Sequence, residues 1–490
     1  MQPLDVMGSF WLPGHERIAR YGRLVFNTKD GGTLHLSDAL AEMADNGETT
    51  EKEGGKRNHV VGYIHEPNCM RPVTLLDCLW LSPTKYHAHM ILIGAHFERE
   101  EDTVFDSVSV RFNDAAAWVG KDAISDDVDL AVGGVERREL VVRLDRPPSK
   151  AARFERGAVA LDFRWSRQDV DHKSLTIEQW PQFELTYDEK TPVGEIVEDT
   201  GHICNLMSLC TDRPGLFESV YLYRADLPMK ALSGDPFPDS QQAIELKARL
   251  GDRSLPGNAR VLSAPEVPVP FDDIGIAGVA TWLNQSPSIT PIIGALLTMR
   301  HHGIYSENRF LNIASAAEGL HRATVGGRYL PESAFRRLRR QLREHVPEEH
   351  HKWFNDLMGH ANAPSLVQRL TELTGELGDS VHSLVGNNVE AWIQAIKRIR
   401  NDLTHLDEDR PMYDGGDLLH LAESLFHVTR LCLLLRIGLN PDRLPWITRT
   451  IRFRGNFVRV EDAIERIFPP RPAVEDSDEV TGGVTPGAQA

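Results

Sequence analysis

The spacing of hydrophobic and polar positions divides the chain into a strand-rich first part and a helical second part. In the first part, short runs of β-branched and aromatic residues are separated by turn residues, as at 29–32 and 146–148. A helical stripe over 193–210 interrupts this pattern, and the polar, Gly-rich segment 46–57 is predicted to be a loop. The predicted strands cover residues 23–26, 33–36, 60–65, 73–78, 89–96, 104–112, 138–144, 158–165, 183–187 and 219–223.

From about Pro287 onward, apolar residues recur every three to four positions, which predicts helices. These helices are expected at residues 289–302, 306–324, 332–344, 350–362, 365–374, 389–405 and 417–437. A Pro-rich start at 469–472 then opens a tail of Gly, Thr, Pro and acidic residues. We therefore expect an α+β multidomain protein with a mainly β N-terminal domain (1–284), an all-α helical bundle (285–468) and a disordered tail (469–490).

Composition narrows the class of protein further. Of the 490 residues, 41% are hydrophobic and 26% are charged, which excludes a collagen-like or wholly disordered chain. The longest clean apolar runs, 90–94 and 431–435, are much shorter than the roughly 18 residues that a bilayer requires, so no membrane association is expected. The first residues lack the basic and apolar regions of a secretory signal, which indicates a cytoplasmic protein.

The acidic charge is concentrated in the N-terminal part. The net charge is −17, but residues 285–468 hold 23 basic and 22 acidic residues, whereas residues 1–284 hold 30 basic and 45 acidic ones. This distribution excludes a generally basic, nonspecific nucleic-acid binder. It leaves RNA binding by the helical part open, and it favours a protein over RNA as the partner of the N-terminal domain.

Candidate chemistry lies near the end of the predicted helix 389–405, where Arg400, Asn401 and His405 occur together. His transfers protons near neutral pH, Arg holds a phosphate with two hydrogen bonds, and Asn can orient either group. On an ideal helix, Arg400 and His405 point about 140° apart, so they meet only if the helix distorts or two copies face each other. The alternative from spacing alone is that Arg400 pairs with an acid and His405 caps the helix.

The arrangement R-N-x-x-x-H resembles the signature of the HEPN superfamily, in which Arg is followed by a polar residue and then by His four to six positions later. HEPN domains are compact helical bundles, and many are metal-independent ribonucleases. Residues 315–322 resemble the early HEPN helix that carries an acidic residue, here Glu318, toward the motif.

The N-terminal part resembles the ApeA N-terminal domain, which precedes a HEPN domain in anti-phage proteins. The similar segments are 8–14, 22–24, 32–36, 74–78 and 105–118. Together the two resemblances imply an abortive-infection effector that cleaves host or phage RNA, with tRNA as one candidate, after a trigger such as a phage protein is sensed.

For the site, the resemblance implies that His405 is the general base or acid and that Arg400 stabilises charge on the phosphorane-like transition state. Asn401 orients the site, and Glu318 supports it. No metal or cofactor is implied, and the expected products are a 2′,3′-cyclic phosphate and a 5′-hydroxyl. Because one His does not readily act as both acid and base, the resemblance also implies a homodimer through the HEPN domain.

Two alternatives to an active nuclease stay open. In the first, the HEPN domain is a catalytically silent module for dimerisation or RNA binding. In the second, it is a toxin controlled by covalent modification such as nucleotidylation, for which Tyr413 is the nearest hydroxyl-bearing aromatic residue.

The densest basic run contains Arg336, Arg340 and Arg343, which share one helix face and are candidates for RNA contacts. The alternative is a solvated face balanced by neighbouring acids.

Two further patterns are weaker. Asp239, Glu245 and Lys247 match a written metal-nuclease pattern, but the spacing is tight and residues 241–250 are predicted to be a helix instead of the required strand. A zinc site could be formed by a set of one histidine and four cysteines, namely His202, Cys204, Cys210, Cys69 and Cys78. The absence of any C-x-x-C pair favours buried thiols instead.

Overall fold

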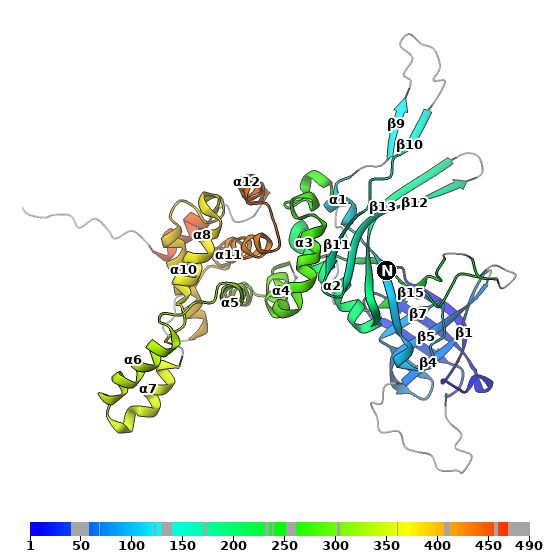
Figure 1. Ribbon diagram of the computed structural model, residues 1–490, viewed down its shortest axis with the longest axis horizontal. Helices are drawn as coiled ribbons and strands as arrows, with labels where there is room; N and C mark the ends of the chain where they lie inside the picture. The colour runs from blue at the N-terminus through cyan, green and yellow to red at the C-terminus, as the bar shows by residue number, and fades with distance from the viewer. Residues whose placement is uncertain are drawn as a thin grey trace, which may run out of the picture.

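A computed structural model gives the architecture shown in Figure 1. It describes residues 1–40, 58–67, 69–121, 124–128, 140–170, 174–230, 235–237, 240–250, 261–300, 304–359, 361–405, 412–454 and 459–468. The predicted loop at 46–57 and the predicted disordered tail at 469–490 lie outside these residues.

One end of the molecule is a small antiparallel barrel. Its strands are β1 (Leu4–Trp11), β2 (Arg20–Asn27), β3 (Gly31–Leu36), β4 (Asn58–Glu66), β5 (Cys69–Ser82) and β6 (Lys85–Ala88). They pair in the order β5-β4-β1-β2-β3-β6, and an additional β5–β6 pairing closes the ring. Closure removes exposed strand edges, and the interior is filled by buried apolar side chains such as Phe10, Leu24 and Ile64.

Glycines permit the tight curvature of this barrel. A Cβ atom at Gly62 would lie 2.7 Å from Phe10 Cδ1, and one at Gly8 would lie 2.9 Å from Phe10 Cζ. The Phe10 ring therefore occupies the space that side chains at these two positions would need, and only glycine fits beneath it.

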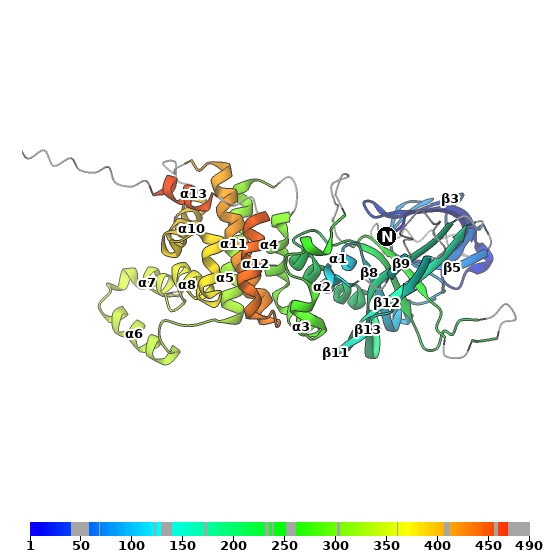
Figure 2. The same cartoon turned by 90° about the horizontal axis from the view of Figure 1, so that it is seen from above.

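The same sheet continues beyond the barrel through a second group of strands. These are β7 (Met90–Ile93), β8 (Val104–Phe112), β11 (Lys150–Phe154), β12 (Gly157–Val170), β13 (Ser174–Pro192), β14 (Phe217–Tyr223) and β15 (Ile244–Ala248), and β9 (Ile124–Val128) with β10 (Leu140–Leu144) forms a separate ribbon. The helices α1 (Ala115–Val119), α2 (Val193–Thr211) and α3 (Phe271–Gln285) pack against this part of the sheet (Figure 2).

The second part of the chain is helical, as predicted. Its α-helices are α4 (Thr290–Leu297), α5 (Ser306–Thr324), α6 (Glu332–Glu344), α7 (His351–Met358), α8 (Leu366–Glu376), α9 (His382–Val385), α10 (Val389–Thr404), α11 (Gly415–Arg436), α12 (Leu444–Arg454) and α13 (Val460–Ile467). The helix α11 is long and apolar enough to cross a membrane by length and composition alone, but 78% of the relevant window is buried inside the protein. It is the central helix of the bundle and packs against α5, α8, α9 and α13.

The two parts share one continuous hydrophobic core, which includes Phe183 of the sheet, Trp282 of α3 and Leu425 of α11. The predicted boundary between residues 284 and 285 lies at the end of α3, where the 3₁₀ helix Ser286–Ile289 follows directly. The helix α3 itself, in the part expected to be mainly β, was not predicted from the sequence.

An ion-pair network that includes the fully buried Arg430 crosses this junction. Asp212 ends α2 in the left-handed conformation, with φ of 61°. Its carboxylate lies 2.8 Å from Arg300 Nε and 3.1 Å from Arg430 Nη1. Arg300 also donates to both oxygens of Glu423 on α11, at 2.7 and 3.0 Å. Three elements that are distant in sequence are thereby joined by charge-assisted hydrogen bonds.

The fold class is confirmed, but the prediction of a helix at 241–250 is wrong because these residues contain β15. Ile244, Leu246 and Ala248 alternate and are buried, and the strand pairs with β7 and β14. The alternation has the period of a strand, and sheet pairing satisfies the backbone of these residues.

We predict that Asp212→Asn lowers the free energy of unfolding by about 3 kcal/mol at pH 7, because it leaves buried Arg430 without its carboxylate. Burial raises the pKa of Asp212, but Arg300 and Arg430 outweigh this effect, so the pKa lies below its ordinary value. The stabilisation by the Asp212 carboxylate is therefore complete above its unfolded-state pKa of about 4. It is lost as the pH falls through the lower pKa of the folded state.

Urea denaturation of the parent and the variant at a series of pH values measures this difference. The difference in unfolding free energy between parent and variant should stay constant from pH 8 to about pH 5 and decrease below about pH 4. Asp188→Asn is the matched control because its pair with Arg153 is exposed, and it should leave the unfolding free energy nearly unchanged. If Asp212→Asn and Asp188→Asn lower the unfolding free energy equally, the junction network does not stabilise the fold as proposed.

Candidate active site

The candidate motif lies at the C-terminal end of α10. The helix begins after Asn388, whose side chain accepts a hydrogen bond from the Ala391 N–H at 2.9 Å. A stripe of buried residues holds the helix in the bundle, comprising Trp392, Ile393, Ala395, Ile396, Ile399 and Leu403. Because the stripe fixes the rotation of α10, it also fixes the direction in which Arg400 projects.

Arg400 projects toward α5, which supplies the expected acidic partner. Arg400 Nη2 lies 3.3 Å from Glu318 Oε1, and Arg400 Nη1 donates to Asn401 Oδ1 at 3.4 Å. The Arg400 side chain remains 35% exposed and the Glu318 side chain 21% exposed. Within the part of the chain that the structure describes, these contacts use two of the five N–H donors of the guanidinium, and the others remain for a phosphate group.

His405 occupies the position after the last helical residue. Its backbone N–H still donates to the Asn401 carbonyl at 3.0 Å, and its side chain is exposed. Among the described residues, no contact joins the imidazole to Arg400. Arg400, Asn401 and Glu318 therefore lie together, whereas His405 lies apart at the accessible end of the helix.

Asp402 and Arg398 form a second polar group on α10 that was not predicted. The Tyr413 hydroxyl donates to Asp402, and Arg398 Nε lies 3.9 Å from the same carboxylate. Burial and the Asp402 carboxylate raise the pKa of Tyr413. The i,i+4 spacing of Arg398 and Asp402 is a sequence signal that could have revealed the ion pair. Tyr413, the candidate for modification, thus has its hydroxyl engaged with the helix that carries the motif.

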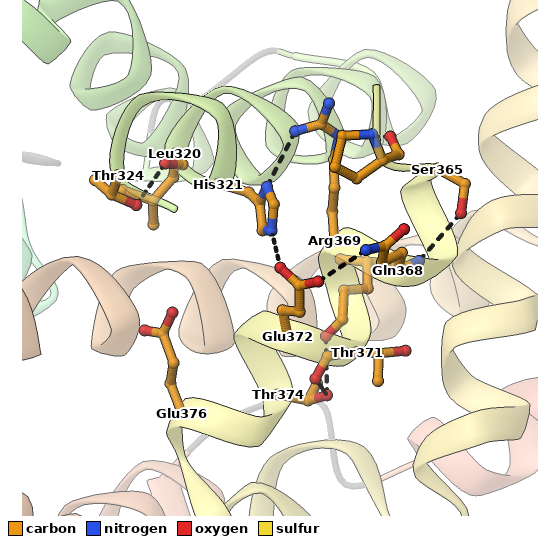
Figure 3. Close-up of polar contacts among 12 residues, drawn as sticks. Leu320, His321, Thr324, Ser365, Gln368, Arg369, Thr371, Glu372, Thr374 and Glu376 are labelled. Carbon is orange, nitrogen blue, oxygen red and sulfur yellow. Dashed lines mark hydrogen bonds and ion pairs between the residues drawn. The ribbon is translucent and has the colours of Figure 1, made fainter. Parts of the chain in front are cut away.

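A third polar group, drawn in Figure 3, lies between α5 and α8. His321 is fully buried, with its Nε2 2.6 Å from Glu372 Oε2 and its Nδ1 3.0 Å from Arg369 Nη1. Periodicity alone could not reveal this group, since its partners are about 50 residues apart.

The predicted basic face lies on a two-helix arm formed by α6 and α7, which projects away from the bundle in both views (Figures 1 and 2). Arg336 is paired with Glu332 at 3.0 Å. Arg340 and Arg343 are exposed, and neither has an ion-pair partner within the described part of the chain. Trp353 on α7 is also exposed, at 62%.

The residues of the two metal-site patterns lie in the N-terminal part of the chain, mainly on α2 and β15. Across the described residues, no group of three or more His, Cys, Asp or Glu side chains could hold a metal ion. Cys204 and Cys210 are buried within α2, and burial raises the pKa of the Cys210 thiol to about 12. Glu245 and Lys247 form an ion pair at 2.8 Å on β15, whereas Asp239 lies outside the described residues.

Comparison with protein families gives two matches to the chain. A family model described as ApeA N-terminal domain 1 matches residues 5–284, which is more than half of the chain. A second, described as Apea-like HEPN, matches residues 311–443 and thus includes Glu318, Arg400 and His405. No match was found among curated proteins or among solved structures.

The contrast between exposed and buried histidines generates a prediction. Diethyl pyrocarbonate should modify His405 at least about tenfold faster than His321 and His427, because the two buried side chains react only after local opening. Peptide mass spectrometry over a time course measures the three rates. Similar rates at His405 and His321 would contradict the described arrangement.

Proposed function

Because the chain belongs to the ApeA family and carries an ApeA-like HEPN domain of the nuclease type, we propose that it is a metal-independent endoribonuclease of an anti-phage abortive-infection system. It acts in the cytoplasm on host or phage RNA, with tRNA as one candidate substrate. The observation that carries the proposal is the end of α10, where Arg400 lies beside Glu318 with N–H donors that no other described residue uses, and where His405 is exposed.

The proposed reaction uses only side chains of the protein. His405 removes the proton from a ribose 2′-hydroxyl or donates one to the leaving 5′-oxygen, and the 2′-oxygen attacks the adjacent phosphorus. The guanidinium of Arg400 stabilises the negative charge that develops on the phosphorane oxygens. Asn401 and Glu318 hold Arg400 in place. The 5′-oxygen then leaves, giving a 2′,3′-cyclic phosphate and a 5′-hydroxyl.

We also propose a homodimer that brings two motifs together. One His405 acts as base and that of the second copy acts as acid, so each histidine performs one proton transfer. This arrangement fits the separate directions of Arg400 and His405 on one helix. The acidic N-terminal domain is proposed to sense a protein trigger from the phage, in keeping with its 45 acidic and 30 basic residues.

We predict that His405→Ala and Arg400→Ala each lower the rate of RNA cleavage about 100-fold or more, because each removes a group that acts in the transition state. The assay uses total cellular RNA in EDTA, followed by analysis of the fragment ends. His382→Ala, which changes another exposed histidine of the bundle, is the matched control and should cleave at the parental rate. Equal cleavage by parent and His405→Ala would overturn the proposal.

The two-helix arm gives a second prediction for the same enzyme. The double substitution of Arg340 and Arg343 by Ala should raise KM and leave kcat unchanged, since phosphate contacts provide binding without chemistry. The slope of log KM against log salt should fall by about 2, or about 1 per lost contact. Arg449→Ala, an exposed Arg on α12, is the control. An unchanged KM and salt slope would exclude the arm as an RNA contact.

A further inference from the structure

The polar group between α5 and α8 takes no direct part in the proposed reaction, yet it is built from charged side chains at high cost. His321 is fully buried and Arg369 is 4% exposed. Arg369 donates from Nε to the Pro364 carbonyl at 3.1 Å and from Nη1 to His321 Nδ1 at 3.0 Å (Figure 3). Burying such groups is unfavourable unless their hydrogen bonds are satisfied, so each member constrains the others.

The hydrogen bonds determine where the proton of His321 resides. A guanidinium only donates, so Nδ1 of His321 must accept from Arg369 and carry no hydrogen. Nε2 then carries the hydrogen and donates to Glu372 Oε2 at 2.6 Å. Glu372 also accepts from Gln368 at 3.0 Å, which fixes the carboxylate on the surface of α8. His321 thus connects Arg369 and Glu372 as an acceptor on one side and a donor on the other.

This group lies one helical turn along α5 from Glu318, the acidic partner of Arg400. Glu318 and His321 lie three residues apart on α5 and therefore project from neighbouring turns of one face. Burial and Arg322 lower the pKa of Arg369, whereas Glu318 and Glu372 oppose that shift. Glu318 Oε1 lies 3.3 Å from Arg400 Nη2, so one turn of α5 carries both the buried His321 and the acidic partner of Arg400.

We propose that His321 is a positioning residue for the nuclease site: its hydrogen bonds to Arg369 and Glu372 hold the turn of α5 that carries Glu318, and Glu318 in turn holds Arg400. This inference rests on the proposed function of Arg400. His321 does not touch the substrate because it is fully buried. An apolar side chain at this position would leave Arg369 with an unpartnered buried donor, and the turn of α5 that carries Glu318 would move relative to α8.

The test compares His321→Leu with the conservative His321→Gln. Leu removes both hydrogen bonds, whereas Gln can accept from Arg369 and donate to Glu372. We expect His321→Leu to lower kcat about 10-fold with KM nearly unchanged, as for a misplaced catalytic group. His321→Gln should restore most of the rate. Glu376→Gln, which breaks the 2.6 Å ion pair of α8 with Arg436 without touching His321, is the control and should leave kcat unchanged.

A double-mutant cycle with Glu318→Gln separates positioning from general destabilisation. If His321 acts through Glu318, adding His321→Leu to Glu318→Gln should lower kcat no more than about twofold further, because coupled residues are not additive. The proposal would be overturned if the two substitutions lower kcat multiplicatively, or if His321→Gln is as slow as His321→Leu. Glu372→Ala, at a partly exposed position, serves as a second variant if His321→Leu does not fold, and it should also be non-additive with Glu318→Gln.

The design distinguishes this inference from the proposed function. If the parent cleaves no RNA either alone or with a lysate of phage-infected cells, the nuclease proposal fails, and the double-mutant cycle is then measured by urea denaturation. Non-additive shifts in the denaturation midpoint would support the connection between His321 and Glu318, and additive shifts would overturn it.

Discussion

The structure depends on the ion pairs that Asp212 makes where the N-terminal part meets the helical bundle. Two guanidinium groups, those of Arg300 and Arg430, are held there by the carboxylates of Asp212 and Glu423. Arg430 is fully buried, so its charge is tolerated only while Asp212 remains in place. A cavity of about 320 Å³, lined in part by Asp212, Arg213 and His427, adjoins this network. The hydrophobic core continues across the junction but is not directional, whereas these ion pairs specify how α2 and α11 meet.

The helix α11, which carries part of this network, also supports the candidate active site through its packing on α5. Glu423 and Arg430 belong to α11, and α11 packs along α5, which carries Glu318 and His321. The position of Glu318, and through it of Arg400, therefore depends on the packing of α5 on α11. Interiors packed at high density transmit displacements from one face of a helix to the other. The junction network and the site are thus connected through α11, which is mostly buried.

Local patterns predicted much of this fold but little of its polar network. The bounds of α5 and α6 agree with the predicted helices because α5 carries a stripe of apolar residues at three-to-four spacing and Pro331 directly precedes α6. The strand β1 was not predicted because Gly8 and polar positions interrupt its hydrophobic pattern, and the reason for that glycine lies in Phe10 of the closed barrel. Arg400 and His405 were identified by resemblance, whereas spacing alone favoured an ordinary helix end. The contacts of His321 join residues about 50 positions apart, and only the tertiary fold brings such residues together.

The directions of Arg400 and His405 limit how any phosphate can be bound. The Asn401 carbonyl still accepts the His405 N–H at 3.0 Å, so the backbone does not turn the imidazole back toward Arg400. Glu318 draws Arg400 toward α5, while His405 remains exposed at the helix end. A single copy therefore presents the Arg400 guanidinium and the His405 imidazole in different directions. Two copies related by a twofold axis would each contribute one group to a shared phosphate, which is why we propose that the complete site is formed between protomers.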